Sequence, residues 1–164
     1  MKYAYWDSNC FIGYLADEEY GRDARMGVIQ AVERGELRLV TSAFTLVEVV
    51  KLKVKDGDVP PRMSSAQRAS LEACFSPANG VVIVNVDVTT ATKAREAVWD
   101  RGIDPKDAIH VGSALQFKES ALSPDDELVF HTFDKKLIKR ADGYEGVRFE
   151  ELGGHPYQPD LDLG

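Results

Sequence analysis

Short runs rich in β-favouring residues alternate along the chain with stretches that repeat apolar residues at helical spacing. Strands are predicted at 3–7, 37–41, 81–86, 127–132 and 146–150. Helices are predicted at 9–18, 21–33, 43–55, 65–75, 89–101, 105–118 and 134–142. The run VVIVNV at 81–86 is apolar almost throughout, which is typical of a parallel strand covered on both faces. This alternation predicts an α/β sheet with helices on both faces.

Two of the predicted helices carry specific packing expectations. The helix at 105–118 is apolar or small on nearly every side, which predicts a central buried helix. In the helix at 43–55, which Ser42 is placed to cap, Phe44, Val47 and Val50 recur at helical spacing and are expected to face the core.

The length of 164 residues and the apolar content of 44% fit one compact domain, which we place at 1–152. The segment 56–65 is predicted to be a loop, and 153–164 a loop or a disordered tail. No run of 18 apolar residues is present, and Asp7 interrupts the apolar N-terminus too early for a signal peptide, so we expect a cytoplasmic protein with no membrane span. Cys10 and Cys74 stand apart without a CxxC motif and are interpreted as packing residues.

The formal net charge of −7 would ordinarily argue against a nucleic-acid-binding protein. A cluster of acids around divalent cations could account for part of that charge. Basic residues are also grouped, in one run at Lys51, Lys53 and Lys55 and in another at Lys135, Lys136, Lys139 and Arg140. The first run is interpreted as a solvated helix face. The second run is either a solvated helix face or a surface that binds RNA.

Four carboxylates lie close behind a predicted strand or near a predicted helix start: Asp7, Glu48, Asp107 and Asp134. Ligands of α/β sheets bind in the crevice beyond the carboxyl ends of the strands, where such residues gather. Taken one at a time, Asp7, Asp107 and Asp134 could equally be helix caps or first-turn acids. Capping is also the preferred interpretation for Asp104.

Glu48 is different, because it lies beyond the first helical turn among apolar residues. We expect its side chain to be half-buried, and the alternative is a surface ion pair with Lys51. Acids that converge without arginine repel one another, and hard divalent cations relieve that repulsion. All-oxygen ligation favours Mg²⁺ or Mn²⁺, which can activate water for hydrolysis of a phosphodiester.

The order of the motifs 7-DSN-9, 42-SAFTLVE-48, 107-DAIHVGSAL-115 and 132-TFD-134 resembles PIN-domain ribonucleases, and especially VapC-type toxins of toxin–antitoxin pairs. The resemblance implies an α/β/α sandwich with a parallel sheet of about five strands. It also implies Mg²⁺- or Mn²⁺-dependent RNA hydrolysis, a small antitoxin partner and a homodimer. It carries the metal ligands onto Asp7, Glu48, Asp107 and Asp134, with Ser8, Asn9 and Thr132 as polar support. The 56–65 loop and the tail after 152 make this chain longer than the commonest toxin pattern.

Two other functions remain open at this point. In an aspartate-nucleophile phosphatase Asp7 would attack phosphate, but the second aspartate expected two residues later is replaced by Asn9. The other is a non-catalytic PIN-like module that binds proteins. We expect His110 to be a satisfied core or supporting histidine rather than a general base, and Trp6 and Trp99 to be core residues rather than platforms for bases.

Overall fold

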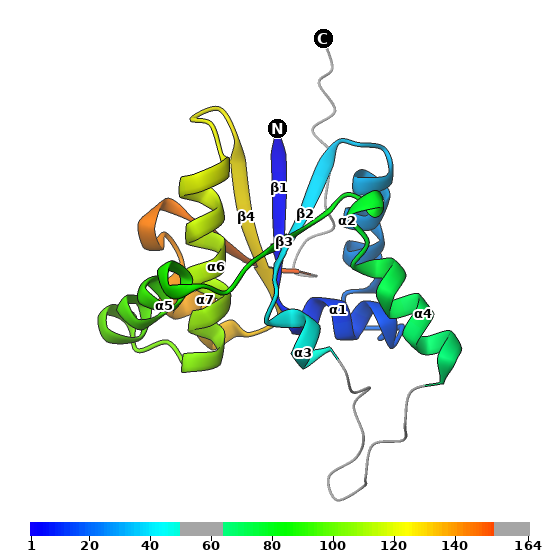
Figure 1. Cartoon of the computed structure of the whole chain (residues 1–164), viewed down its shortest axis with the longest axis horizontal. Helices are drawn as coiled ribbons and strands as arrows, with labels where there is room; N and C mark the ends of the chain where they lie inside the picture. Colours follow the sequence, from blue (N-terminus) through cyan, green and yellow to red (C-terminus); the bar gives the residue numbers. More distant parts are fainter. Residues whose placement is uncertain (50–63, 153–164) are drawn as a thin grey trace, which may run out of the picture.

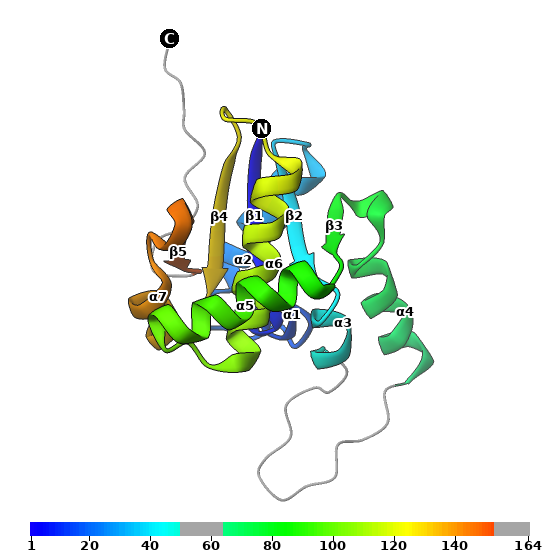
Figure 2. The same ribbon diagram turned by 60° about the vertical axis from the view of Figure 1, so that its left-hand side comes forward.

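A parallel sheet of five strands lies at the centre of the fold (Figures 1 and 2). The computed structural model of the chain describes residues 1–49 and 64–152. The strand order is β3-β2-β1-β4-β5, and all four neighbouring pairs are parallel. The strands are β1 Lys2–Trp6, β2 Leu37–Ser42, β3 Val81–Val84, β4 Glu127–Thr132 and β5 Arg148–Glu151.

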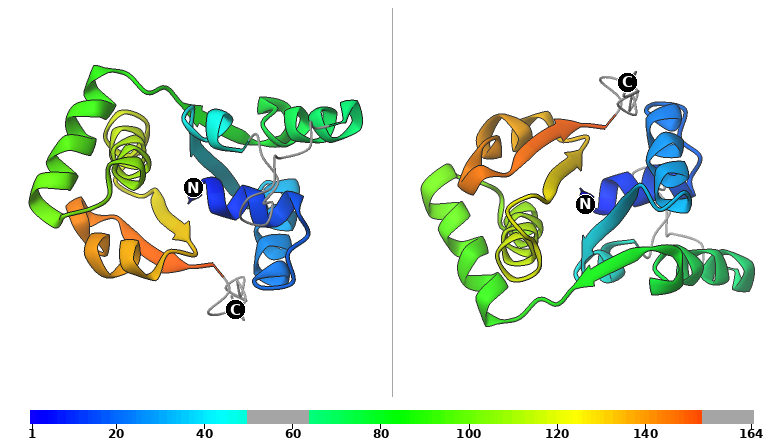
Figure 3. Two further views of the ribbon diagram at one scale, coloured as in Figure 1. Left: turned by 90° about the horizontal axis from the view of Figure 1, so that it is seen from below. Right: turned by 90° about the horizontal axis from the view of Figure 1, so that it is seen from above.

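Helices form a layer on each face of the sheet, which confirms the predicted three-layer α/β/α architecture. Figures 1 and 3 show α1, α2 and α4 on one side and α5, α6 and α7 on the other. The helices are α1 Ser8–Leu15, α2 Arg22–Glu33, α3 Thr45–Glu48, α4 Ser65–Cys74, α5 Val88–Arg101, α6 Pro105–Ala121 and α7 Lys135–Ala141. Short 3-10 turns lie at Pro77–Asn79 and Tyr144–Gly146. No helix in the described ranges has both the length and the apolar content of a membrane span.

Strand β1 is central and contributes side chains to both layers of the core. Tyr5 packs on the α6 side, where its ring stacks on Phe130 at 4.6 Å. Ala4 and Trp6 point to the opposite side and pack in the core formed with α1 and α2. Because successive side chains of a strand alternate between its faces, a central strand must be apolar at nearly every position.

Helix α6 is buried along most of its length, as predicted. Small residues allow α5 to cross it closely. A Cβ atom on Gly112 would lie 2.6 Å from the carbonyl oxygen of Thr90 and 2.9 Å from the backbone nitrogen of Ala94, so this position has room only for glycine. The tight α5–α6 contact holds the first turn of α6 at the carboxyl end of the sheet.

The expectation that Trp99 belongs to the core is wrong, whereas Trp6 is fully buried. Trp99 is 70% exposed, and the guanidinium of Arg95 lies 4.7 Å from the centre of its ring. The inward face of α5 is occupied by Thr90, Ala94 and Ala97. The close approach of α6 leaves no space for an indole on that face.

The expectation that Val47 faces the core is also wrong, because its side chain is 67% exposed. Helix α3 is a single turn, and its backbone leaves helical geometry at Val49 (φ −82°, ψ 42°). Thr45 and Val49 are the buried residues of this turn instead. A four-residue turn need not present the same face as the longer predicted helix would.

Several predictions lie outside the described residues. These are the rest of the helix at 43–55 with Val50, the basic run of Lys51, Lys53 and Lys55, most of the 56–65 loop and the 153–164 tail. The remaining elements agree with their predicted bounds to within a few residues. Cys10 is buried and Cys74 partly buried, and both are free thiols, as expected for packing residues.

Candidate active site

The four predicted acids all lie at the carboxyl end of the sheet. Asp7 directly follows β1, and Asp134 follows β4 after one residue. Glu48 ends the turn of α3 that comes after β2, and Asp107 lies in the first turn of α6. We call this set of Asp7, Glu48, Asp107 and Asp134 the acidic mouth. Parallel strands end at one edge, so segments far apart in sequence deliver their carboxylates to the same place.

Asp7 is buried and uses both of its oxygens. Oδ1 accepts a hydrogen bond from the backbone nitrogen of Cys10 at 3.1 Å, which caps α1. Oδ2 accepts a hydrogen bond from the hydroxyl of Thr132 at 2.6 Å. Burial raises the pKa of Asp7 above its ordinary value, although the bonds from Thr132 and Cys10 and the charge of His110 oppose the rise. Asp7 therefore caps α1 and also contributes its carboxylate to the acidic mouth.

Thr132 connects Asp7 to Asp134. Its hydroxyl donates to Asp7 and accepts a hydrogen bond from the backbone nitrogen of Asp134 at 3.0 Å. Asp134 caps α7 through Oδ1, which accepts from the backbone nitrogens of Lys136 at 2.7 Å and Leu137 at 3.1 Å. Within the described residues, Oδ2 of Asp134 has no hydrogen-bond partner, so one oxygen of this carboxylate is free to bind a ligand.

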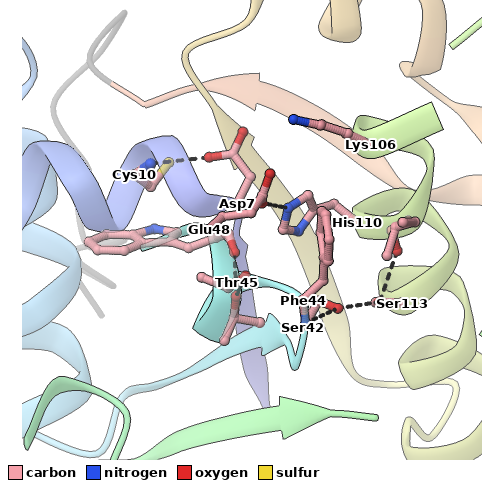
Figure 4. A network of polar contacts seen from close by, with 12 residues as sticks. Asp7, Cys10, Ser42, Phe44, Thr45, Glu48, Lys106, His110 and Ser113 are labelled. Carbon is pink, nitrogen blue, oxygen red and sulfur yellow. Dashed lines mark hydrogen bonds and ion pairs between the residues drawn. The ribbon is translucent and has the colours of Figure 1, made fainter. Parts of the chain in front are cut away.

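Glu48 is held by a buried histidine (Figure 4). Oε2 of Glu48 lies 2.7 Å from Nε2 of His110, and Nδ1 of His110 lies 3.0 Å from the hydroxyl of Tyr5. Because a carboxylate only accepts hydrogen bonds, Nε2 of His110 donates, and in the neutral ring Nδ1 accepts from Tyr5. Burial raises the pKa of Glu48, but His110, the hydroxyl of Ser8 and the charge of Lys106 together lower it below its ordinary value. Glu48 is thus kept ionised and oriented.

The turn that carries Glu48 is fixed by buried hydroxyls. Thr41 donates to the carbonyl oxygen of Trp6 at 2.8 Å, and its hydroxyl lies 2.7 Å from that of Thr45. Ser42 accepts from the backbone nitrogen of Phe44 at 3.1 Å and from the hydroxyl of Ser113 at 2.9 Å. These bonds tie α3 to β1 and α6, so Glu48 has a defined position although its helix is a single turn.

Asp107 experiences the repulsion that the sequence predicts. Burial is the largest cause of a rise in its pKa to about 6. The other causes of the rise are the charges of three neighbouring acids, Asp134, Asp104 and Asp7. No hydrogen bond or ion pair reaches its carboxylate from the described part of the chain. Asp104 caps α6 by accepting from the backbone nitrogen of Lys106 at 3.1 Å, as predicted.

The donor atoms of the acidic mouth suit a hard divalent cation, because they are carboxylate oxygens and because the charges of Asp134 and Asp7 help to raise the proton affinity of Asp107. The four acidic side chains lie at the same end of the sheet, but they do not converge on a single point. Within residues 1–49 and 64–152, no three histidine, cysteine, aspartate or glutamate side chains are close enough to hold a metal ion as they stand.

Two hollows flank Asp134. One, of about 330 Å³, is lined by Ile103, Asp104, Asp107, Asp134, Lys136, Leu137 and Arg140. The other, of about 720 Å³, is lined by Asn9, Glu18, Tyr20, Phe133, Asp134, Lys135, Lys136 and Glu151. A larger cavity of about 870 Å³ lies away from the acids, between α1, α2 and α4. The acids, rather than cavity size, mark the candidate site.

The predicted RNA-facing residues lie on α7 beside the mouth, but two of them already have partners. Lys135 lies 3.4 Å from the carboxylate of Glu151, and the guanidinium of Arg140 donates to the carbonyl oxygen of Gly102. Lys136 lines both hollows, and Lys139 is exposed. Of the predicted supporting residues, Thr132 and Ser8 contact the acids, whereas Asn9 is exposed in the larger hollow.

Two residues of the candidate site make contacts that the sequence did not predict. His110 was expected to be satisfied, and it is buried, but its link between Tyr5 and Glu48 was not predicted. The signal was a histidine one helical turn after Asp107 in an apolar run. The other residue is Lys106, and the signal for it is its position directly before Asp107 in the sequence.

Three comparisons relate the chain to known proteins. The sequence matches the family model for the PIN domain over residues 4–143. No curated protein matches it significantly. Three solved structures share its fold at low sequence identity, and all three are complexes.

The first is VapBC2 from Rickettsia felis bound to a promoter DNA fragment, with 12% identity, a TM-score of 0.59 and coverage of 92% of this chain and 98% of that chain. The second is a toxin–antitoxin complex from Klebsiella pneumoniae, with 20% identity, a TM-score of 0.53 and coverage of 95% and 99%. The third is DNA-bound VapBC from Salmonella typhimurium, with 17% identity, a TM-score of 0.55 and coverage of 93% and 99%. The family match spans most of the chain and the fold agrees with it, so this chain belongs to the PIN-domain family.

Proposed function

We propose that this chain is a metal-dependent endoribonuclease that hydrolyses RNA phosphodiester bonds with Mg²⁺ or Mn²⁺. The observation that carries the proposal is that Asp7, Glu48, Asp107 and Asp134 lie together at the carboxyl end of the sheet, where burial and then the charges of Asp134, Asp104 and Asp7 raise the pKa of Asp107 to about 6. A carboxylate destabilised by its neighbours in an open mouth is a good ligand for a divalent cation. Membership of the PIN-domain family agrees with this chemistry.

The four acids of the mouth would hold the metal. When bound, a divalent cation supplies an activated water and neutralises charge on the phosphate. The protein provides the positions of the ligands. Thr132 and the backbone nitrogen of Cys10 fix Asp7, and His110 fixes Glu48. Asp107 has no competing hydrogen bond within the described residues and is free to bind.

A metal-dependence assay on a labelled single-stranded RNA tests the proposal. Cleavage should require Mg²⁺ or Mn²⁺, stop with a chelator and fall by at least about 10²-fold in Asp7→Asn and Asp107→Asn. Asp125→Asn is a matched control, because Asp125 is exposed beside the start of β4, at the opposite end of the sheet. Each variant should keep the circular dichroism spectrum of the parent. RNA cleavage that persists in a chelator, or phosphatase activity without RNA cleavage, would overturn the proposal.

We further propose that the nuclease is the toxin of a toxin–antitoxin pair, acts in the cytoplasm and forms a homodimer. The three similar structures, which are VapBC or toxin–antitoxin complexes, support this step. Expression of the chain alone should arrest growth, and co-expression of a small protein encoded beside it should relieve the arrest. Asp107→Asn should not arrest growth at an equal protein level. Light scattering of the purified chain tests the dimer.

A further inference from the structure

A lysine at the start of α6 has no structural task that the described contacts explain. Lys106 is exposed, and its side chain extends from the first turn of α6 toward the carboxylates of Asp7 and Glu48 (Figure 4). Its backbone nitrogen donates a hydrogen bond to the carboxylate of Asp104, which caps α6. Its ammonium makes no ion pair with a described residue. Other lysines of the molecule do have such partners, such as Lys93 with Glu119 at 2.5 Å.

The dipole of α6 by itself disfavours a cation at the position of Lys106. The N-terminus of a helix carries partial positive charge, so a lysine there costs stability relative to a neutral side chain. The nearby acids offset that cost only while their charge is uncompensated. If divalent cations were bound by these acids, the attraction between Lys106 and the acids would fall, and its ammonium would face the space in front of them.

We infer that Lys106 binds a non-bridging oxygen of the RNA phosphate that is cut; this inference rests on the proposed function. A phosphodiester placed at the acidic mouth presents such an oxygen to the end of this side chain. An ammonium there stabilises negative charge that grows on the phosphate as water attacks. Lysine suits the role because it is a compact point charge on a flexible stem. Lys106 is therefore a substrate-contacting residue beside Asp107 and not a metal ligand.

The competing explanation is that Lys106 only reduces repulsion among the acids. The two explanations differ in what neutralisation of Lys106 does to RNA. If Lys106 only offsets the charge of the acids, its neutralisation changes the stability of the metal-free protein. RNA binding in saturating metal then stays unchanged. A phosphate contact affects the salt dependence of RNA binding, because each neutralised phosphate of a single strand contributes about 0.7 to the slope of log Kd against log salt.

The test compares Lys106→Gln with Lys93→Gln, which removes the same charge from α5 at a site where the ammonium already pairs with Glu119. Binding of a fluorescent single-stranded oligoribonucleotide is measured by anisotropy in Ca²⁺ over a series of KCl concentrations, and the RNA is checked for integrity afterwards. In parallel, kcat and KM are measured in saturating Mn²⁺ for the full chain. Lys106→Arg tests rescue of the positive charge.

The inference expects Lys106→Gln to bind RNA about threefold to tenfold more weakly at low salt, with a salt slope smaller by about 0.7. Its kcat should fall by on the order of tenfold, with partial recovery in Lys106→Arg. Lys93→Gln should match the parent in all these measurements. An unchanged slope and kcat in Lys106→Gln, in a parent that cleaves RNA, overturns the inference alone. A parent that neither binds nor cleaves RNA overturns the proposed function and this inference together.

Discussion

His110 donates a hydrogen bond from Nε2 to Oε2 of Glu48 over 2.7 Å and so connects residues 62 positions apart in sequence. The same ring contacts the hydroxyl of Tyr5 at 3.0 Å through its other nitrogen. One buried imidazole therefore attaches a carboxylate on a single-turn helix to the central strand of the sheet. The position of Glu48 depends on this attachment, because α3 is too short to hold a side chain by itself.

Replacement of His110 by alanine should loosen Glu48 and leave the hydroxyl of Tyr5 buried without its partner. We expect the free energy of unfolding to fall by about 2 kcal/mol or more, since a buried polar group loses its bond and a cavity forms. Urea denaturation followed by circular dichroism measures the loss.

A double-mutant cycle with Tyr5→Phe isolates the hydrogen bond from the effect of volume. Tyr5→Phe alone should cost about 1 kcal/mol, and the combined variant should lose less than the sum of the two single losses. Strictly additive losses would show that the Tyr5–His110 contact does not stabilise the fold.

Asp107 should make the metal-free protein less stable at neutral pH. Its pKa in the folded protein, about 6, lies above the ordinary value of 3.8. Its stabilising contribution is therefore complete below about pH 3.8 and is lost as the pH rises through 6. In a chelator at pH 7.5, Asp107→Asn should be more stable than the parent by about 1 kcal/mol, after allowance for partial solvent screening of a half-buried group.

Thermal unfolding in a chelator at pH 7.5 and at pH 4 measures this effect. The advantage of Asp107→Asn should be much smaller at pH 4, where Asp107 is protonated in the folded protein and only about half ionised in the unfolded chain. An advantage of equal size at the two pH values would contradict electrostatic repulsion as its cause.

His131 should have the opposite dependence on pH. Burial, with the charge of Arg148, lowers its pKa from 6.5 to about 4, and Nδ1 accepts a hydrogen bond from the indole nitrogen of Trp6 at 3.3 Å. The stability that it contributes is present above pH 6.5 and is lost as the pH falls toward 4, because the unfolded chain takes up a proton first. The expected loss is about 3 kcal/mol.

The comparison of parent and His131→Gln in urea at pH 7 and pH 4.5 separates this contribution from that of the carboxylates. The parent should lose more stability than the variant over this range. Equal losses in both proteins would show that His131 does not titrate with a lowered pKa.

The two tryptophans should be distinguishable by fluorescence. Trp6 is fully buried, whereas Trp99 is 70% exposed under Arg95. We expect Trp99→Phe to shift the emission maximum to shorter wavelength and to remove most quenching by acrylamide, with little change in stability because little apolar surface is lost. Trp6→Phe should have the reverse optical effect, and equal quenching of both variants would contradict the assigned exposures.

Gly112 offers a test in which two effects have opposite signs. Helix propensity alone predicts that Gly112→Ala stabilises the protein by up to about 1 kcal/mol. The closeness of the carbonyl oxygen of Thr90 and the backbone of Ala94 predicts instead a loss of about 2 kcal/mol or more, since backbone atoms cannot rotate away. Thermal unfolding of this single variant decides between them.

Much of the fold was predictable because the alternation of strands and helices is strong. The strand at 127–132 was predicted with its observed bounds, and α6 was correctly expected to be buried. The errors arose where tertiary contacts override local pattern. Trp99 follows the apolar residues Ala97 and Val98, but α6 approaches α5 so closely at Gly112 that an indole has no space on the inward face.

The position of the four acids at the carboxyl end of the sheet was predictable, because each follows a strand or lies near the start of a helix in the sequence. Their partners were harder to find. The Glu48–His110 bond joins α3 to α6, and no local spacing predicts such a contact. The sequence offered Lys51 as a partner for Glu48 at helical distance, but Lys51 lies outside the described residues and the carboxylate bonds to a histidine on α6.

The hydrogen bond from Thr132 to Asp7 spans 125 positions, and strand β4 lies beside the first strand of the chain. During translation, Asp7 emerges from the ribosome long before Thr132 and Asp134 have been made. A nascent chain therefore cannot assemble the acidic mouth until most of the polypeptide is finished. If the chain cleaves RNA as proposed, it gains that activity only after Asp134 has been synthesised.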